Sequence, residues 1–168
     1  MLGLPLEVAT LRSTRLAVER ELQVGDFLLR YKRADGLAGG EGAFLVCSFW
    51  HVDSLLAEGE GEAATRLFER LLGCANDVGL YAEEIDPHSG AFLGNFPQAF
   101  THLGLINTAV SLGLFQKYGP EAVRGGYADR ARRSVRSTFG WRGVLAALLS
   151  TGHIRLFSSR ASRMPRQK

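Results

Sequence analysis

Residues 76–87 read NDVGLYAEEIDP, and residues 93–100 read LGNFPQAF. Glycine and proline recur too often here for one continuous helix, so the two stretches predict a long loop followed by a helix that starts at Pro97. Two adjacent carboxylates, Glu83 and Glu84, lie inside this loop. Apolar side chains surround them, namely Tyr81, Ile85, Phe92, Phe96 and Phe100. Because burial near apolar groups can tune a carboxylate for acid–base work, the stretch predicts a catalytic loop.

Helical periodicity flanks this loop on both sides. Apolar residues recur at helical spacing over residues 6–22, 43–57, 62–74 and 97–118. Residues 27–31 read as a short extended link, and strand signals are weak along the whole chain. Helices joined by alternating long and short connections are typical of α-solenoids and α/α toroids. The sequence therefore predicts an all-α fold.

A second motif lies upstream of the loop. Residues 35–50 read DGLAGGEGAFLVCSFW. Together the two motifs resemble glycoside hydrolase family 15, the glucoamylase and trehalase-like enzymes, and the resemblance covers roughly residues 5–112. It implies an (α/α)6 toroid, a ring of helix pairs, as the catalytic domain. The helices predicted here are too few to close that ring, so we expect residues 1–120 to form an incomplete toroid.

The resemblance also assigns roles to the two acids. Inverting hydrolysis of a glycosidic bond needs a general acid and a general base, roughly 6.5–9.5 Å apart. Glu83 matches the family's general base, and Glu84 matches a supporting position. Neighbours in the chain tend to point apart, so Glu83 and Glu84 are not expected to form the acid–base pair. No residue here matches the family's general acid, and the chain alone is expected to be inactive.

Several other side chains are candidates for sugar binding. Arg30, beside Tyr31, matches a place where the family presents an arginine to sugar hydroxyls, for which a planar guanidinium is suited. Glu41 lies in the second motif and is a weak candidate for a substitute acid. Trp50 would stack on a sugar ring or belong to the core. Gln98 and His102 are four residues apart on one helix face, so they would either reach the site or satisfy buried backbone groups.

Charge divides the chain into two parts. Residues 1–120 carry nine Lys and Arg against 15 Asp and Glu, whereas residues 121–168 carry 11 against two. We interpret residues 121–168 as a divergent basic tail, with one short helix over residues 141–149 and disorder over residues 158–168. Such tails usually aid solubility, and no nucleic-acid motif accompanies this one, so we do not expect nucleic acid as a partner.

The remaining patterns narrow the class of protein. The sequence has no phosphate-binding glycine motif and no Cys/His metal spacing, so we expect no cofactor and no metal. It shows neither a signal peptide nor a membrane-spanning apolar run, which predicts a cytoplasmic protein.

The main prediction is a fragment of an inverting α-glucoside hydrolase, with an α-glucoside or oligosaccharide as its substrate. The alternative is a non-catalytic carbohydrate-binding or regulatory remnant of the same fold. In either case, apolar helices that lack neighbours would favour self-association.

Overall fold

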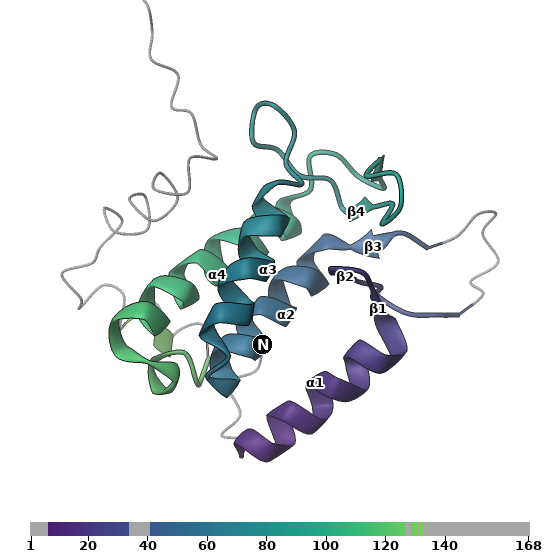
Figure 1. The fold of residues 1–168 in the computed structure, drawn as a ribbon. Coiled ribbons are helices and arrows are strands. Elements are labelled where there is room, and N and C mark those ends of the chain that lie inside the picture. The colour runs from purple at the N-terminus through teal and green to yellow at the C-terminus, as the bar shows by residue number, and fades with distance from the viewer. Residues whose placement is uncertain (1–6, 34–40, 127–128, 131, 133–168) are drawn as a thin grey trace, which may run out of the picture.

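The computed structural model describes residues 7–33, 41–126, 129–130 and 132 (Figure 1). The first part of the second motif, before Glu41, lies outside the described residues. So does most of the basic tail, with its predicted helix over residues 141–149 and its predicted disorder over residues 158–168.

The chain is mostly helical, as predicted. The helices that can be bounded within the described residues are α1 (Val8–Leu22), α2 (Leu45–Glu58), α3 (Gly61–Leu72) and α4 (Ala99–Tyr118), followed by the 3-10 turn η1 (Pro120–Ala122). The bounds of all four α-helices lie within two residues of the predicted ranges. Gly59 ends α2 in the left-handed conformation, with φ of 95°, which favours glycine and allows the tight turn into α3.

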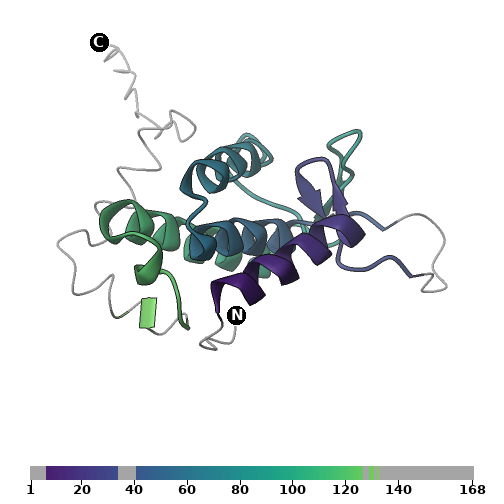
Figure 2. The same cartoon turned by 60° about the horizontal axis from the view of Figure 1, so that its bottom comes forward.

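Helix α2 lies at the centre of the molecule. Two contacts show that it runs parallel to α4. Gly104 packs on Val46 and Phe49 near the start of both helices. About one turn further along α4, the Thr108 hydroxyl donates to the Phe49 carbonyl at 3.2 Å. Helices α1 and α3 run antiparallel to α2 on its other sides (Figures 1 and 2). Both α2 and α4 therefore begin at the same end of the molecule.

The core fills the space between α2, α3 and α4. Its buried side chains are aliphatic or aromatic, and Phe49 meets both Phe68 and Tyr81 edge to face, with ring centroids 6.3 and 5.9 Å apart. Such edge contacts suit the charge distribution of aromatic rings. The Tyr81 hydroxyl donates to the Leu72 carbonyl at 3.1 Å, so its buried polar atom is satisfied.

Two small antiparallel sheets correct the all-α prediction. Strand β1 (Gln23–Val24) pairs with β2 (Phe27–Leu28), and β3 (Ala43–Phe44), β4 (Glu84–Ile85) and β5 (Phe92–Leu93) form the second sheet in that order. Each strand has only two residues, which is too short for an alternating pattern to be visible. The β3–β4 pairing also joins segments that are distant in sequence.

The start of α4 differs from the prediction. Pro97 was expected in its first turn, but α4 begins at Ala99, with Gln98 as the N-cap residue. Pro97 precedes the cap and follows a cis peptide bond from Phe96. The Gln98 side chain accepts a hydrogen bond from the Phe100 amide at 3.3 Å, and this satisfies one of the free N–H groups that open a helix.

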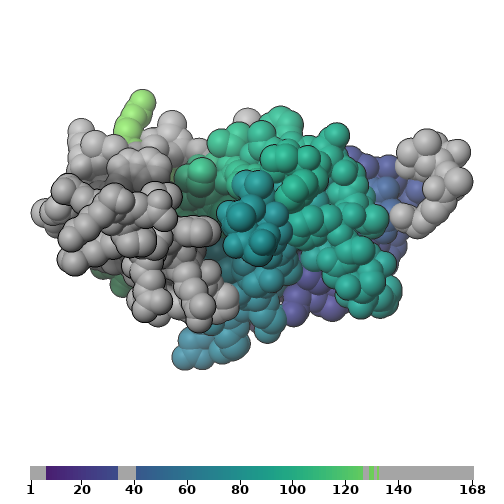
Figure 3. All heavy atoms as spheres, turned by 90° about the horizontal axis from the view of Figure 1, so that it is seen from above, coloured from purple at the N-terminus to yellow at the C-terminus, as the bar shows by residue number. Residues whose placement is uncertain are grey.

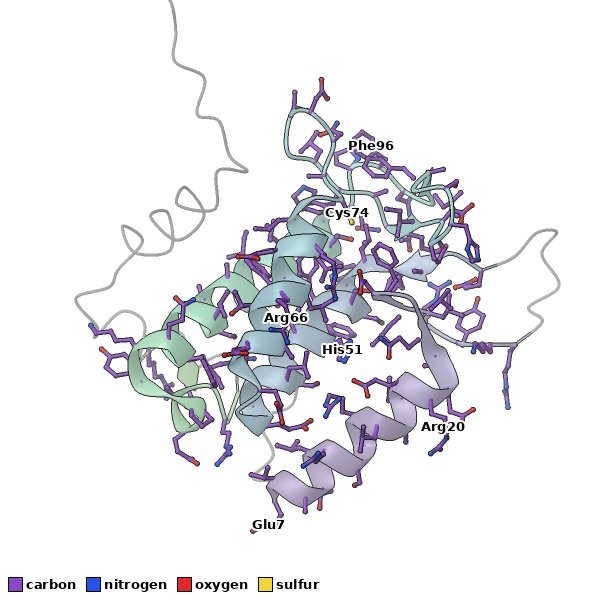
Figure 4. The ribbon with its side chains drawn as sticks, in the orientation of Figure 1. Glu7, Arg20, His51, Arg66, Cys74 and Phe96 are labelled. Carbon is purple, nitrogen blue, oxygen red and sulfur yellow. The ribbon has the colours of Figure 1, made fainter. Side chains whose placement is uncertain are left out.

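Polar contacts hold α1, which has no buried residue. Arg15 donates two hydrogen bonds to the carboxylate of Glu58 in α2, at 2.7 and 2.9 Å, and also pairs with Glu19. The Nε2 atom of His51 lies 2.7 Å from Glu19 Oε1 (His51 is labelled in Figure 4). A charged cluster of Arg15, Glu19, His51 and Glu58 therefore links α1 to α2.

The described residues after α4 also contact the helices. Ala122 and Val123 are buried in the core, and the Arg124 side chain donates to the Ala57 carbonyl at 3.0 Å. Arg130 is buried against Asp53 of α2 and Ser111 of α4. The predicted division at residue 120 stays a prediction, but the first residues beyond it pack against the helical body.

The outer face of α4 carries exposed apolar side chains, and none of the described residues buries them. Phe100 is 67% exposed, and Leu103 and Ile106, on the same side of the helix, are also exposed. Among the described residues, no helix has the length and apolar character needed to cross a membrane.

Candidate active site

The β3–β4–β5 sheet places the acidic loop at the end where α2 and α4 begin. The Leu45 amide, at the start of α2, donates to the Glu83 carbonyl at 3.1 Å, and the Gln98 amide, before α4, donates to the Tyr81 carbonyl at 2.9 Å. The loop is thus bonded through its main chain to both helices. Figure 3 looks onto this end, where teal and green atoms of the loop and of α4 cover the centre.

Glu83 lies against the β5–α4 connection. The backbone amide and the side-chain amide of Asn95 both donate to Glu83 Oε2, at 3.1 and 2.7 Å. The Glu83 amide in turn donates to the Asn95 carbonyl at 2.9 Å. Gly94, with φ of 70°, leaves the space that the carboxylate occupies, since a Cβ there would lie 2.9 Å from Glu83 Oε2.

Glu84 lies in a different environment, as expected for neighbours in the chain. Its carboxylate lies beside Gly42, where an added Cβ would be 2.9 Å from Oε2. Arg30 Nη2 is 3.6 Å from Glu84 Oε1 and donates to Glu41 Oε1 at 2.8 Å. The structure therefore brings the three predicted residues Arg30, Glu41 and Glu84 into one cluster.

Aromatic rings fix the arginine of this cluster. The Arg30 guanidinium carbon lies 4.9 Å from the ring centroids of both Tyr31 and Phe44. Cation–π contacts of this kind favour a defined position for a planar guanidinium. The aromatic contacts and the bond to Glu41 together orient Arg30 near Glu84.

Burial raises the pKa of Glu84, and the neighbouring negative charge of Glu41 raises it further. Arg30 and the backbone amide of Gly42 act in the opposite direction without reversing the shift. Glu84 therefore keeps its proton to a higher pH than a solvated glutamate.

Gln98 and His102 lie beneath the loop and support its backbone. The side chain of Gln98 caps α4, and its backbone carbonyl lies 2.7 Å from His102 Nδ1. His102 Nε2 accepts a hydrogen bond from the Tyr81 backbone amide at 3.4 Å. These two partners assign the proton of the neutral ring to Nδ1. Of the two alternatives for Gln98 and His102, these contacts match the satisfaction of backbone groups.

Trp50 lies on an exposed side of α2. The residue is 40% exposed, and none of the described hydrogen bonds or ring contacts joins it to Glu83 or to the Arg30 cluster. Closer to the acids, Phe92 and Phe96 pack together with ring centroids 5.3 Å apart (Phe96 is labelled in Figure 4).

Asn95 contacts Glu83 but was not among the predicted site residues. In the sequence, the pair Gly94-Asn95 between two apolar residues indicates a tight turn, but it does not indicate which residue the turn contacts. Only the β4–β5 pairing shows that this turn returns to Glu83. Within the described ranges, no group of three or more His, Cys, Asp and Glu side chains could hold a metal ion.

Comparison with known proteins places the chain in a family. The model of the family described as "Glycosyl hydrolases family 15" matches residues 9–110. Over 110 residues the chain is 52% identical to the trehalase of Mycolicibacterium smegmatis and 53% identical to that of Mycobacterium tuberculosis, in each case 64% of this chain and 16% of the relative. The trehalase of Thermoplasma volcanium is 48% identical over 96 residues, 56% of this chain and 15% of that protein.

No solved structure matches the chain. The chain spans about one sixth of the length of the curated trehalases that it matches, 16% of each of the first two. The family match nevertheless covers more than half of the chain and includes both motifs and every candidate site residue. The chain therefore belongs to glycosyl hydrolases family 15.

Proposed function

We propose that this chain is the part of an inverting α-glucoside hydrolase that carries the general base, Glu83. The observation that carries the proposal is the position of Glu83 in the matched region: its carboxylate is held through one oxygen, at the end where two parallel helices begin. Glu84 supports the base, and Arg30 and Glu41 bind sugar hydroxyls beside it. Trp50, Gln98 and His102 complete the proposed sugar site, the last two by holding the backbone of the loop.

The substrate proposed first is trehalose, because the relatives named above are trehalases. Maltose and longer α-glucosides remain part of the same proposal. None of the residues that the family resemblance covers matches the general acid that would act opposite Glu83. We therefore propose that the chain acts as a piece of a larger catalytic site, in the cytoplasm, and that alone it turns over substrate poorly.

The helix arrangement supports an incomplete (α/α)6 toroid as the fold. In such a ring the inner helices run parallel to one another and the outer helices antiparallel to them. Helices α2 and α4 are parallel neighbours, whereas α1 and α3 run the other way. We propose α2 and α4 as inner helices, and the open apolar face of α4 as the position of the next pair.

The test is glucose release from trehalose, maltose and starch by the intact chain, compared with Glu83→Ala. Removal of a positioned base lowers the rate by about 10²–10⁴-fold. Glu62→Ala is the matched control, because the Glu62 side chain is 95% exposed in the first turn of α3. Turnover that survives Glu83→Ala would contradict the assignment of the base.

The second candidate is a non-catalytic carbohydrate-binding module. It is favoured by the Arg30–Glu41 ion pair, whose guanidinium and carboxylate can hydrogen-bond sugar hydroxyls without taking part in proton transfer. Calorimetric titration with trehalose separates the two candidates: binding without any turnover supports the module, and Arg30→Ala should then weaken binding. Absence of both turnover and binding would rule out both candidates for the isolated chain.

A further inference from the structure

We infer that Gly94 and Asn95 form a positioning unit that orients the carboxylate of Glu83 and directs its second oxygen toward the reacting water. Asn95 is a positioning residue in this inference, since it acts through Glu83 and not on the substrate. The inference rests on the proposed function, in which Glu83 is the general base.

The contact between Asn95 and Glu83 is reciprocal. Two donors of Asn95, one from the main chain and one from the side chain, converge on Glu83 Oε2 at 3.1 and 2.7 Å. The Asn95 carbonyl receives the Glu83 amide at 2.9 Å. Two donors on one oxygen fix both the position and the rotation of a carboxylate better than one donor does. No described residue donates to Glu83 Oε1, so this oxygen is available to a water molecule.

Gly94 gives the unit its shape. An added Cβ at this position would lie 2.9 Å from Glu83 Oε2, closer than real Cβ contacts, and 3.0 Å from Glu83 Cβ, which is a very tight contact. The backbone of Gly94 is also in the left-handed region, with φ of 70°, where side chains are strained. Glycine thus lets the backbone reach the carboxylate closely enough for the Asn95 amide to donate.

The residue type at position 95 follows from the chemistry. Asparagine offers N–H donors and no charge, so it holds an ionised carboxylate without competing for the proton that the base must take up. An aspartate has nearly the same shape but presents only acceptor oxygens to Glu83. Asn95→Asp therefore removes the side-chain donor, keeps the backbone donor and changes the volume little, and it is the most direct test of the unit.

The first measurement does not depend on activity. In the intact chain, nuclear magnetic resonance reports the three-bond couplings across the χ1 bond of Glu83 and the pH titration of both Asn95 amide groups. We expect a single Glu83 rotamer, averaging of that rotamer in Asn95→Asp, and loss of the Asn95 titration in Glu83→Gln. The inference would be overturned if the Glu83 couplings stayed unchanged in Asn95→Asp, or if the Asn95 amide signals behaved in Glu83→Gln as they do in the wild type.

The second measurement uses turnover of trehalose. Asn95→Asp is expected to lower kcat by about tenfold or more while KM stays within about twofold, because the base loses orientation and sugar binding does not change. Asn107→Ala is the control. Asn107 lies on α4, its backbone carbonyl accepts a hydrogen bond from Ser111, and its side chain takes part in none of the described side-chain hydrogen bonds. A normal kcat for Asn95→Asp in an enzyme that needs Glu83 would overturn the positioning role.

The two measurements separate the two ideas. If the couplings respond to Asn95 but Glu83→Ala leaves turnover unchanged, the proposed function fails and the contact stands without a catalytic purpose. If Glu83→Ala abolishes turnover but the couplings do not respond to Asn95, the proposed function stands and the positioning unit is wrong.

Discussion

Arg130 Nη1 lies 3.3 Å from Asp53 Oδ1, and both side chains are almost fully buried. Arg130 also donates to the Ser111 hydroxyl at 2.6 Å, so it connects the chain beyond η1 to both α2 and α4. Arg130 lies outside the residues that match the family, which end at residue 110. A residue outside the family match therefore bonds to α2, which lies inside the match, and to the part of α4 just beyond its end.

Arg130→Ala is expected to lower the free energy of unfolding by about 3–5 kcal/mol, because it leaves Asp53 buried without its positive partner. Urea unfolding followed by far-ultraviolet circular dichroism measures the change. Arg132→Ala is the matched control: the Arg132 side chain is 78% exposed, so we expect a change within about 0.5 kcal/mol. Equal effects of the two variants would show that the buried ion pair contributes little to stability.

The same variant gives a pH dependence with a defined sign. Burial raises the pKa of Asp53 above its usual range, and Arg130 opposes that shift. Without Arg130 the folded chain holds a proton that the unfolded chain releases above about pH 4. Because the pKa of Asp53 is raised even beside Arg130, the destabilisation of Arg130→Ala should grow as the pH rises through the folded pKa of Asp53 in the wild type, and a difference that stays constant up to neutrality would contradict it.

Helix α1 is expected to detach first in acid. Burial disfavours the charge of Glu19, but hydrogen bonds from His51 and Arg15 outweigh it and lower the pKa of Glu19 below the ordinary value of 4.5. This contribution to stability is present above pH 4.5 and is lost as the pH falls through the lowered pKa. Hydrogen exchange should show α1 losing protection relative to α3 in that range.

Glu19→Gln tests the cause, and we expect it to lower the protection of α1 at neutral pH by about 1–2 kcal/mol and to remove most of the acid response. Glu62→Gln is a control on an exposed i,i+4 pair with Arg66 (Arg66 is labelled in Figure 4). An acid response of α1 that persists in Glu19→Gln would assign the effect to another group.

Two glycines of α4 should respond in opposite directions when replaced by alanine. A Cβ at Gly113 meets nothing within 4 Å, so Gly113→Ala should raise the unfolding free energy by about 0.5–1 kcal/mol through helix propensity. A Cβ at Gly104 would lie 3.0 Å from Val46 Cγ2, so Gly104→Ala should separate α2 from α4 and lower that energy. Thermal unfolding of the two variants measures both signs, and a stabilised Gly104→Ala would contradict the close packing.

Self-association should follow from the uncovered face of α4. Exposed apolar patches of this kind favour association of the free chain. Light scattering should show oligomers that become smaller when Leu103 and Ile106 are both replaced by serine. The exposed residue Leu16 of α1 provides the control, Leu16→Ser, which should leave the oligomers unchanged. A monomeric wild-type chain at high concentration would contradict the prediction.

The sequence was sufficient for the helices because their signals are local. The apolar period of residues 43–57 and the glycines after it place α2 almost as observed, and the stop at Gly119 ends α4 as predicted. Pro97 was predicted in the first turn of α4 but lies in the connection before its N-cap, because the backbone of proline fits both positions. Strands of two residues left no period to detect.

The site was predictable in its residue types but not in its grouping. Arg30, Glu41 and Glu84 stand in three separate segments. The β3–β4 pairing brings Glu84 to the segment that follows Glu41, and the bridge between Leu29 and Ala43 brings Arg30 there. The division of labour between the two glutamates likewise depends on which glycine each one faces, Gly94 or Gly42. Such contacts depend on the path of the chain in three dimensions, and local patterns in a single sequence do not contain that information.

The parallel course of α2 and α4 has an electrostatic consequence. Each helix dipole places about half a positive charge at its N-terminus. Both of these ends meet at the acidic loop, near the carboxylates of Glu83 and Glu84. The helices that form the core thus offset part of the negative charge of the loop through their backbone, which carries no proton that could neutralise a carboxylate.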